Sequence, residues 1–159
     1  MPREGPSPDR VAKAMLLTGT FPRTLDEKKR FGLPKKVRDQ MGDPDTLFVA
    51  PGPDQCLWVF TQEGLEKLAE RLDQTPATDA EARVFRRLYF AQTEAADVDR
   101  AGRIVISERL LQFGGIQREV AVIGVRDHLE LWDPERWQQY LSQHAPRFDA
   151  VAEGAFRKE

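Results

Sequence analysis

The sequence predicts a mainly β fold with short helices, of the α+β class, in which two similar half-units pack into one pseudo-two-fold core. Short apolar segments separated by turns and short helices run through most of the chain, which is typical of this class. The order strand, charged turn, strand, short helix, two strands, helix also occurs twice. Two copies are too few for a solenoid, and each half alone would leave an apolar sheet face exposed, so the halves are expected to pack together.

The first half-unit is expected over residues 15–72. Residues 1–14 mix Pro, Gly, Ser and charge without periodicity, which predicts a flexible leader. Apolar residues over 16–21 indicate a first strand, and alternation over 31–33 indicates a second. The charge cluster between them predicts a turn, so this part of the chain resembles a hairpin.

A short helix and two more strands complete the first half-unit. Pro34 suits the first position of a helix, and Gly42 suits its end. Residues 47–49 and 56–60 are apolar and are joined by a Pro- and Gly-rich turn, which predicts two strands. Thr61 is a candidate N-cap for a helix that follows with one apolar face.

The second half-unit is expected over residues 95–142, after a connecting helix within residues 73–94. Thr78 has capping-box spacing to Glu81, which predicts the start of that helix. Strands of the second half are expected at 104–106, 120–123 and 129–132. Ser107 and Asp133 are candidate N-caps of its two helices. Residues 143–159 lose their periodicity after 145, which predicts a loosely docked C-terminal tail.

Composition places the chain among ordinary globular proteins. It has 159 residues, of which 40% are hydrophobic and 31% charged. No apolar run approaches the roughly 20 residues that cross a bilayer, so no membrane association is expected. Cys56 is the only cysteine, which excludes an internal disulfide and a cysteine-based zinc site and fits a reducing, cytoplasmic compartment.

The formal charge of −2 conceals an uneven distribution along the chain. Residues 21–42 carry seven cations and three anions, which gives +4, and residues 95–118 carry +1. The remaining residues therefore carry −7. A patch of this kind on a neutral background could cover nucleic-acid phosphates, with the first repeat supplying most of the charge.

The repeat itself contains a charged motif. A shift of 73 residues places Asp26 on Asp99 and Arg30 on Arg103, so each copy has Asp-x-x-x-Arg at a strand-to-strand turn. The Asp can accept hydrogen bonds from backbone N–H groups of the turn, and the Arg can pair with it or project outward. Two interpretations stay open at this point: a structural turn on a solvated face, or a repeated DNA-contacting turn in which arginines recognise guanine.

The residues around these turns resemble the MraZ family of bacterial proteins, which carry two tandem SpoVT-AbrB-like half-units. The resemblance covers roughly residues 15–141. It rests on Thr-Leu-Asp-Glu-Lys-Lys-Arg-Phe-Gly-Leu-Pro-Lys-Lys-Val-Arg at 24–38, Asp-Arg-Ala-Gly-Arg-Ile-Val-Ile at 99–106, and the motifs at 122–125, 129–132 and 135–137. It implies a swapped-hairpin β-barrel and a ring-shaped homo-oligomer. It also implies a transcription factor that binds repeated promoter boxes on double-stranded DNA, upstream of its own division and cell-wall operon, with a cytoplasmic, nucleoid-associated location.

The resemblance also implies roles for individual residues. Arg30 and Arg103 correspond to the paired turn arginines of the family, and Asp26 and Asp99 to the residues that hold the turns. The DNA-binding set expected from the resemblance and from the basic patch is Arg30, Arg103, Lys28, Lys29, Arg100 and Arg23. The arginines at 30 and 103 are expected in the major groove, and the lysines and Arg100 on phosphates. Because Lys29 stands where the family usually has Gly, the first turn is expected to differ in shape from the usual one.

Competing interpretations involve either a protein partner or catalysis. An oligomeric protein-binding scaffold or antitoxin-like partner could use the apolar faces of the helices within 61–72 and 78–89. Pro8-Asp9 with Glu27-Lys28-Lys29 matches the loose pattern of metal-dependent nucleases, but such short patterns match by chance. No enzyme activity, cofactor, metal or small-molecule substrate is therefore expected, and Cys56 is read as a small core hydrophobe.

Overall fold

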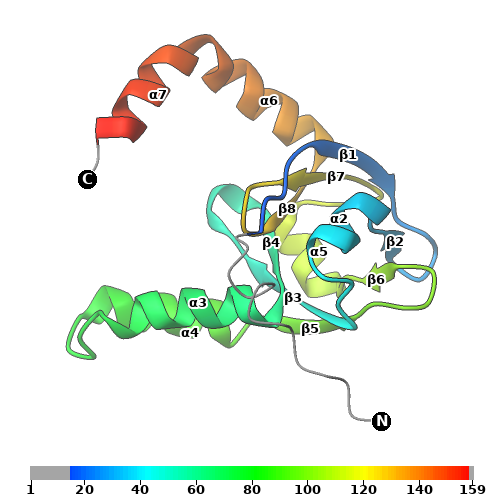
Figure 1. The fold of residues 1–159 in the computed structure, drawn as a ribbon, viewed down its shortest axis with the longest axis horizontal. Coiled ribbons are helices and arrows are strands. Elements are labelled where there is room, and N and C mark those ends of the chain that lie inside the picture. The colour runs from blue at the N-terminus through cyan, green and yellow to red at the C-terminus, as the bar shows by residue number, and fades with distance from the viewer. Residues whose placement is uncertain (1–14, 158–159) are drawn as a thin grey trace.

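The computed structural model describes residues 15–157, so the expected leader at 1–14 and the last two residues lie outside the description. The strands are β1 (Thr20–Thr24), β2 (Arg30–Gly32), β3 (Thr46–Pro51), β4 (Leu57–Phe60), β5 (Glu94–Asp97), β6 (Arg103–Val105), β7 (Glu119–Gly124) and β8 (Leu129–Trp132). The helices are α2 (Lys35–Gln40), α3 (Gln62–Asp73), α4 (Ala80–Phe90), α5 (Glu108–Gly114), α6 (Pro134–His144) and α7 (Phe148–Arg157), with the 3-10 turns η1 (Pro53–Gln55) and η2 (Ala145–Arg147). Figure 1 shows their arrangement and confirms the α+β class.

Most strand pairings in the described chain join its two halves; β3 with β4 and β7 with β8 are the pairs that lie within one half. One antiparallel sheet has the order β1-β7-β8-β4-β3-β5, and a second, two-stranded sheet pairs β2 with β6. The first-half strand β1 lies beside β7 of the second half, and the second-half strand β5 lies beside β3 of the first. The repeat makes β1 equivalent to β5, β3 to β7 and β4 to β8, and exchanging equivalent strands gives the same order read in reverse, which makes the fold pseudo-two-fold. The pairing described for residues 15–157 is open, from β1 to β5, and a closed barrel stays a prediction.

The register of the strands follows the same symmetry. Thr24 pairs with Glu119, and the equivalent pair is Asp97 with Thr46. In each pair the threonine Oγ1 donates a hydrogen bond to the carboxylate, at 2.9 Å to Glu119 and 3.1 Å to Asp97. The 73-residue repeat seen in the sequence is therefore a repeat of strand register as well as of residue type.

The core lies where the two halves meet. Alternate residues of β2 and β6 point inward, so that Phe31 and Ile104 are buried while their neighbours are partly exposed. Phe31 and Ile104 belong to one buried apolar cluster together with residues of the six-stranded sheet, of α2 and of α5. This cluster includes Leu17, Val37, Leu47, Leu57, Val59, Leu110, Leu129 and Leu131. One shared core of this kind explains why neither half stands as a separate domain.

Most helix starts agree with the expected caps. Thr61 Oγ1 accepts from the Gly64 N–H at 3.1 Å, and Ser107 Oγ accepts from the Leu110 N–H at 3.3 Å. The expected cap of α4 is wrong by one residue: Asp79, rather than Thr78, accepts from the Ala82 N–H at 3.0 Å. Both residues suit the N-cap position, so the residue types alone do not choose between them.

Three features differ from expectation. The hairpin expected from the strands over residues 16–33 is not formed, because β1 pairs with β7 and β2 pairs with β6. The first strand is β1 at Thr20–Thr24, several residues later than predicted, because Leu17 forms only an isolated bridge with Arg126. The tail expected to lack periodicity contains α7 over Phe148–Arg157. Its apolar residues Phe148, Val151 and Phe156 have helical spacing, which the short length of the segment obscured. No helix among residues 15–157 has the length and apolar character needed to span a bilayer.

Candidate nucleic-acid interface

The turn between β1 and β2 is built around the carboxylate of Asp26. Its Oδ1 accepts hydrogen bonds from the backbone N–H groups of Lys28 and Arg30, both at 2.9 Å. Its Oδ2 accepts from Arg30 Nε at 2.8 Å, which forms an ion pair. These bonds, chiefly the one from the Arg30 backbone N–H, hold the pKa of Asp26 below its usual value. The carboxylate thus fixes both the turn and the direction of the arginine.

The turn between β5 and β6 repeats this arrangement around Asp99. Its Oδ1 accepts from the backbone N–H groups of Ala101 and Arg103 at 2.9 Å, and its Oδ2 accepts from Arg103 Nε at 2.9 Å. The backbone N–H of Arg103 is again the main cause of a lowered Asp99 pKa. Each carboxylate thus makes the same set of three hydrogen bonds, so the predicted Asp-x-x-x-Arg motif is a repeated structural unit.

The two turns share their backbone conformation as well. Lys29 has a φ of 61°, and Gly102, its equivalent, has a φ of 78°. The Lys29 N–H donates to the Asp26 carbonyl at 3.0 Å, and the Gly102 N–H donates to the Asp99 carbonyl at 2.9 Å. The expectation that Lys29 gives its turn a different shape is therefore wrong, because the lysine adopts the left-handed conformation that glycine takes in the second turn.

The pairing of β2 with β6 brings the two turns onto one small ribbon. Arg30 lies opposite Val105, and Arg103 lies opposite Gly32. Paired residues of antiparallel strands point to the same face, so both arginines lie on the face opposite to buried Phe31. Arg103 lies one strand across from Gly32, which is two residues along β2 from Arg30, and this offset places the Cα atoms of the two arginines about 8 Å apart. The structure therefore brings the two predicted arginines together on one outward surface.

Cross-repeat hydrogen bonds hold each turn against the other half. The Ile106 N–H donates to the Lys29 carbonyl at 3.1 Å, and the Leu33 N–H donates to the Gly102 carbonyl at 2.9 Å. Each left-handed residue thus receives a hydrogen bond from the strand end of the opposite repeat. The spacing between the turns is consequently set by the pairing of the two halves.

The predicted cations differ in exposure. Lys28, Lys29 and Arg100 are exposed at the tips of the turns. The side chains of Arg30 and Arg103 are 25% and 39% exposed, and each uses Nε for its ion pair, which leaves the two Nη groups outside that bond. The tips present exposed charge, whereas the arginines are oriented by their aspartates.

Arg23, also predicted in this set, lies on β1 and turns toward the protein. Its Nε donates to the Gly32 carbonyl at 3.0 Å, and its Nη1 donates to the Pro22 carbonyl at 2.8 Å. The equivalent position in the second repeat is buried Ala96. Arg23 therefore connects β1 to the ribbon, a contact that the second half lacks.

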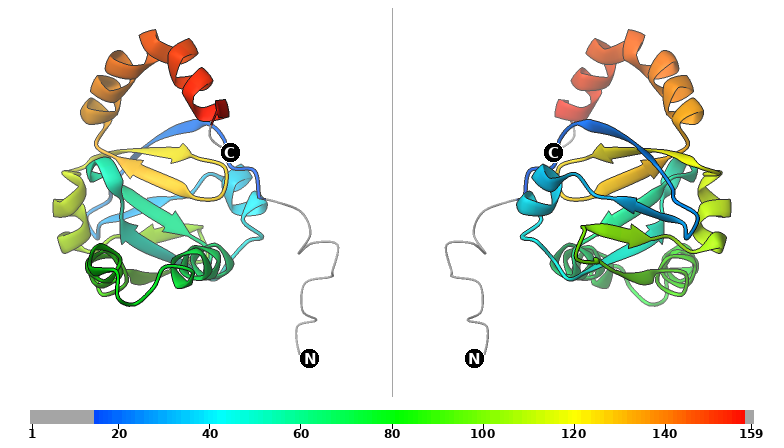
Figure 2. Two further views of the ribbon diagram at one scale, coloured as in Figure 1. Left: turned by 90° about the vertical axis from the view of Figure 1, so that its left-hand side faces the viewer. Right: turned by 90° about the vertical axis from the view of Figure 1, so that its right-hand side faces the viewer.

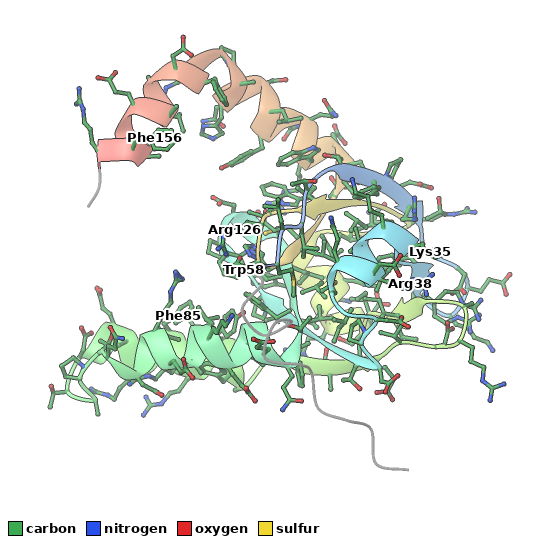
Figure 3. All side chains as sticks on the ribbon, in the orientation of Figure 1. Lys35, Arg38, Trp58, Phe85, Arg126 and Phe156 are labelled. Carbon is green, nitrogen blue, oxygen red and sulfur yellow. The ribbon has the colours of Figure 1, made fainter. Side chains whose placement is uncertain are left out.

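Arg38 contacts the second turn, although in the sequence it stood out only as one cation of the basic patch. It projects from α2 of the first half, labelled in Figure 3, onto the turn of the second half. A Cβ placed on Gly102 would lie 2.4 Å from Arg38 Cζ, so the guanidinium rests directly on that glycine. The only signal in the sequence was a glycine at 102 where the first turn has Lys29.

Two titratable residues, Cys56 and His128, lie away from the turns. Cys56 is buried, as predicted, and burial raises the pKa of its thiol to about 12. His128, buried just before β8, lies within hydrogen-bonding distance of Asp127, at 2.7 Å from Nδ1, and of Glu130, at 3.1 Å from Nε2. Residues 15–157 contain no group of three or more His, Cys, Asp or Glu side chains that could hold a metal ion. Of the nuclease-like pattern, Glu27 lies exposed on the first turn, and Pro8 and Asp9 lie outside the described residues.

Comparison with known proteins identifies the family. The family model "MraZ protein, putative antitoxin-like" matches the chain twice, at residues 16–88 and 89–158. A protein of Finegoldia magna named transcriptional regulator MraZ is 33% identical, over 82% of this chain and 90% of its own. Proteins of the same name from Heliobacterium modesticaldum and Saccharopolyspora erythraea are 34% and 37% identical, over 87% and 81% of this chain and 95% and 89% of their own. With both halves matched and the repeated turns in place, the chain belongs to the MraZ family.

Proposed function

We propose that the chain is a sequence-specific DNA-binding transcriptional regulator of the division and cell-wall gene cluster. It binds repeated promoter boxes as a ring-shaped homo-oligomer, in the cytoplasm and on the nucleoid, with half-units at 15–72 and 95–142 that complete a swapped-hairpin barrel. MraZ is a family of transcriptional regulators rather than enzymes, in agreement with the expected lack of catalysis. The observation that carries the proposal is the pair of matching turns whose arginines share one exposed ribbon face.

The ribbon geometry supports binding in the major groove. That groove, about 12 Å wide, admits a two-stranded β-ribbon. Arg30 and Arg103, about 8 Å apart on the ribbon, would use their Nη groups to contact guanine edges while the aspartates keep Nε in place. Because the aspartates pre-orient the guanidinium groups, less side-chain freedom is lost on binding.

Phosphate contacts would come from the tips of the turns. Lys28, Lys29 and Arg100 are exposed beside the ribbon and carry charge without a fixed direction, which suits contact with the DNA backbone. Each cation that neutralises a phosphate releases counterions, so affinity falls with rising salt. A ring would place several ribbons along successive boxes, and linked weak contacts would raise the overall affinity.

The test separates base recognition from phosphate contact. Boxes are selected from random DNA, and binding to a selected box and to a scrambled one is measured by fluorescence anisotropy and footprinting. Arg30→Ala is expected to lose about 1–3 kcal/mol of discrimination for each base contact removed. Lys28→Ala is expected to weaken both sequences alike and to lower the salt slope by about 1.

Controls address folding and nonspecific charge. Arg30→Lys keeps the charge but not the two-pronged donor geometry, and it should lose discrimination as Arg30→Ala does. Lys67→Ala removes an exposed lysine from α3, away from the turns, and should leave binding unchanged. Wild-type footprints and discrimination in both Arg30 and Arg103 variants, with folding confirmed by thermal unfolding, would rule out the assignment.

An oligomeric protein-binding scaffold or antitoxin-like partner is the second candidate. Exposed apolar side chains on α4 and α7, among them Leu88 and Phe156, favour contacts with protein. Salt distinguishes the two functions. Phosphate-dominated binding weakens steeply between low and moderate ionic strength, whereas binding through an apolar interface does not.

A further inference from the structure

Helix α7 presents an apolar stripe that the rest of the described chain leaves uncovered. Phe148 is 71% exposed, Phe156 is 90% exposed, and Val151 between them is also exposed. Among the described elements α7 packs chiefly on η2, the turn that precedes it. Figures 1 and 2 show it standing away from both sheets. A helix of ten residues is marginal in water by itself, so a partner that covers this stripe would stabilise it.

Helix α4 carries a second exposed apolar surface, which forms a groove. Val84 and Leu88 are exposed, Leu88 by 57%. Together with Ala80, Glu81 and Phe85 they line a shallow, mainly apolar groove of about 310 Å³. The opposite side of α4 is anchored: Tyr89 is buried, and Arg86 Nη2 donates to the Thr75 carbonyl at 3.1 Å. The groove is therefore a fixed surface and not a loosely held helix face.

The two surfaces do not cover each other within one chain in this structure. The arm formed by α3 and α4 lies on one side of the sheets and α6 with α7 lies on the other, and in Figure 1 both reach toward the left, one below and one above (Figures 1 and 2). Figure 3 marks the separation with Phe85 on α4 and Phe156 on α7. With the arms in this arrangement, a contact between these surfaces is made with a second molecule.

Charge favours contact between unlike surfaces. Apart from Arg86, which is held on the opposite side, helix α4 carries two arginines and one glutamate, a net +1, whereas α7 carries two acidic residues and one arginine, a net −1. Pairing α4 with α4 would bring arginines together, and pairing α7 with α7 would bring Asp149 and Glu153 together. Pairing α4 with α7 joins opposite charges around two apolar stripes.

We infer that α7 of one copy docks in the α4 groove of the next copy. The inference rests on the proposed homo-oligomer and names the surfaces that build it. Since the two surfaces differ, the contact is head-to-tail, and repetition of one such contact closes a ring or extends a filament. Aromatic side chains of α7 fill the groove beside Val84 and Leu88, and the acidic residues of α7 face Arg83 and Arg87 of α4.

Cross-linking of mixed variants tests the pairing in the full chain. In a Cys56→Ala background, Leu88→Cys and Phe156→Cys are made separately, and each protein is treated with a short bismaleimide, alone and after mixing and exchange. Covalent dimers are expected from the mixture only. Dimers from either variant alone would indicate like-with-like contact and overturn the inference, as would a wild-type oligomer whose mixture gives no product.

Mass measurement provides the second readout. The wild-type chain is expected at a multiple of 18.2 kDa by light scattering, and Phe156→Asp and Leu88→Asp are expected to shift it to monomer. Gln143→Asp, exposed on α6 outside both surfaces, should keep the wild-type mass. Unchanged mass in both test variants overturns the α4–α7 contact but leaves the proposed oligomer and DNA binding intact. A monomeric wild-type chain overturns the oligomer as well, while anisotropy with single boxes still tests the turns.

Discussion

Replacement of Lys29 by glycine is expected to stabilise the fold and to weaken DNA binding at the same time. Lys29 holds a φ of 61°, where the equivalent residue of the other turn is Gly102. The left-handed conformation costs a residue with a Cβ about 1–2 kcal/mol. Lys29→Gly removes that cost, and it also removes an exposed cation beside the ribbon.

The size of the stabilisation follows from two opposing contributions. Relief of the left-handed strain contributes about 1–2 kcal/mol, and the greater freedom of glycine in the unfolded chain offsets about 0.4–1 kcal/mol. The middle of these ranges gives a net gain of about 0.5–1 kcal/mol. For a chain of this size 1 kcal/mol shifts Tm by about 2–4 °C, so Lys29→Gly should raise Tm by about 1–4 °C. The turn needs no rearrangement, because its hydrogen bonds to Asp26 use the backbone.

The effect on DNA has the opposite sign. Loss of one phosphate contact should weaken selected and scrambled boxes alike, with a salt slope lower by about 1. Thermal unfolding monitored by circular dichroism and anisotropy titrations at several salt concentrations measure both effects on the same samples.

Two matched variants isolate the causes. Lys28→Gly removes the neighbouring charge at a residue without positive φ, so it should change the salt slope in the same way without raising Tm. Gly102→Ala imposes the left-handed strain on the second turn and places a Cβ against Arg38, so it should lower Tm. The reasoning fails if Lys29→Gly lowers Tm as much as Lys28→Gly does, since the conformational cost of Lys29 would then be absent.

Two further predictions concern titratable groups. The folded-state pKa values of Asp26 and Asp99 lie below the unfolded ones, so their contribution to stability is complete above the unfolded pKa and is lost as pH falls through the folded pKa. The urea midpoint should therefore fall as pH is lowered from 5 to about 3, and less steeply in Asp99→Asn; an equal slope would contradict the role of this turn. Burial raises the pKa of the Cys56 thiol to about 12, so a thiol reagent such as Ellman's should label it at pH 8 only after denaturation. Rapid labelling of the native chain would contradict its place in the core.

The local features of the fold could be predicted from the sequence because they have local causes. Alternation around Phe31 and Ile104 predicts strands whichever strand lies beside them, and Ser107 predicts a helix start by its own hydrogen bond. The strand partners that join the two halves have no such local cause. The residues of β1 do not indicate that β7, about a hundred residues later, lies beside them. The cross-repeat pairing therefore had to come from the structure.

The candidate site also combines features with local causes, which the sequence predicts, and contacts between distant segments, which it does not. Asp26 and Arg30 are four residues apart and define their turn within one segment, and the recurrence at Asp99 and Arg103 made the motif visible. The contact of Arg38 with Gly102 joins two segments 64 positions apart and leaves only an unexplained glycine in the sequence. Similarly, Arg23 looked like one more cation of the patch until its bond to the Gly32 carbonyl gave it a structural role.

The exchange of hydrogen bonds between the repeats bears on how the two arginines would act on DNA. Each turn is closed by its own aspartate, but the position of the turn depends on the other half. The Leu33 N–H donates a hydrogen bond to the Gly102 carbonyl, and the Ile106 N–H donates one to the Lys29 carbonyl. A change that displaces one turn therefore moves the strand that carries the arginine of the other. The spacing between Arg30 and Arg103 is a property of the joined core and not of either repeat, and the duplication thereby fixes the distance between two base contacts that separate half-units would leave variable.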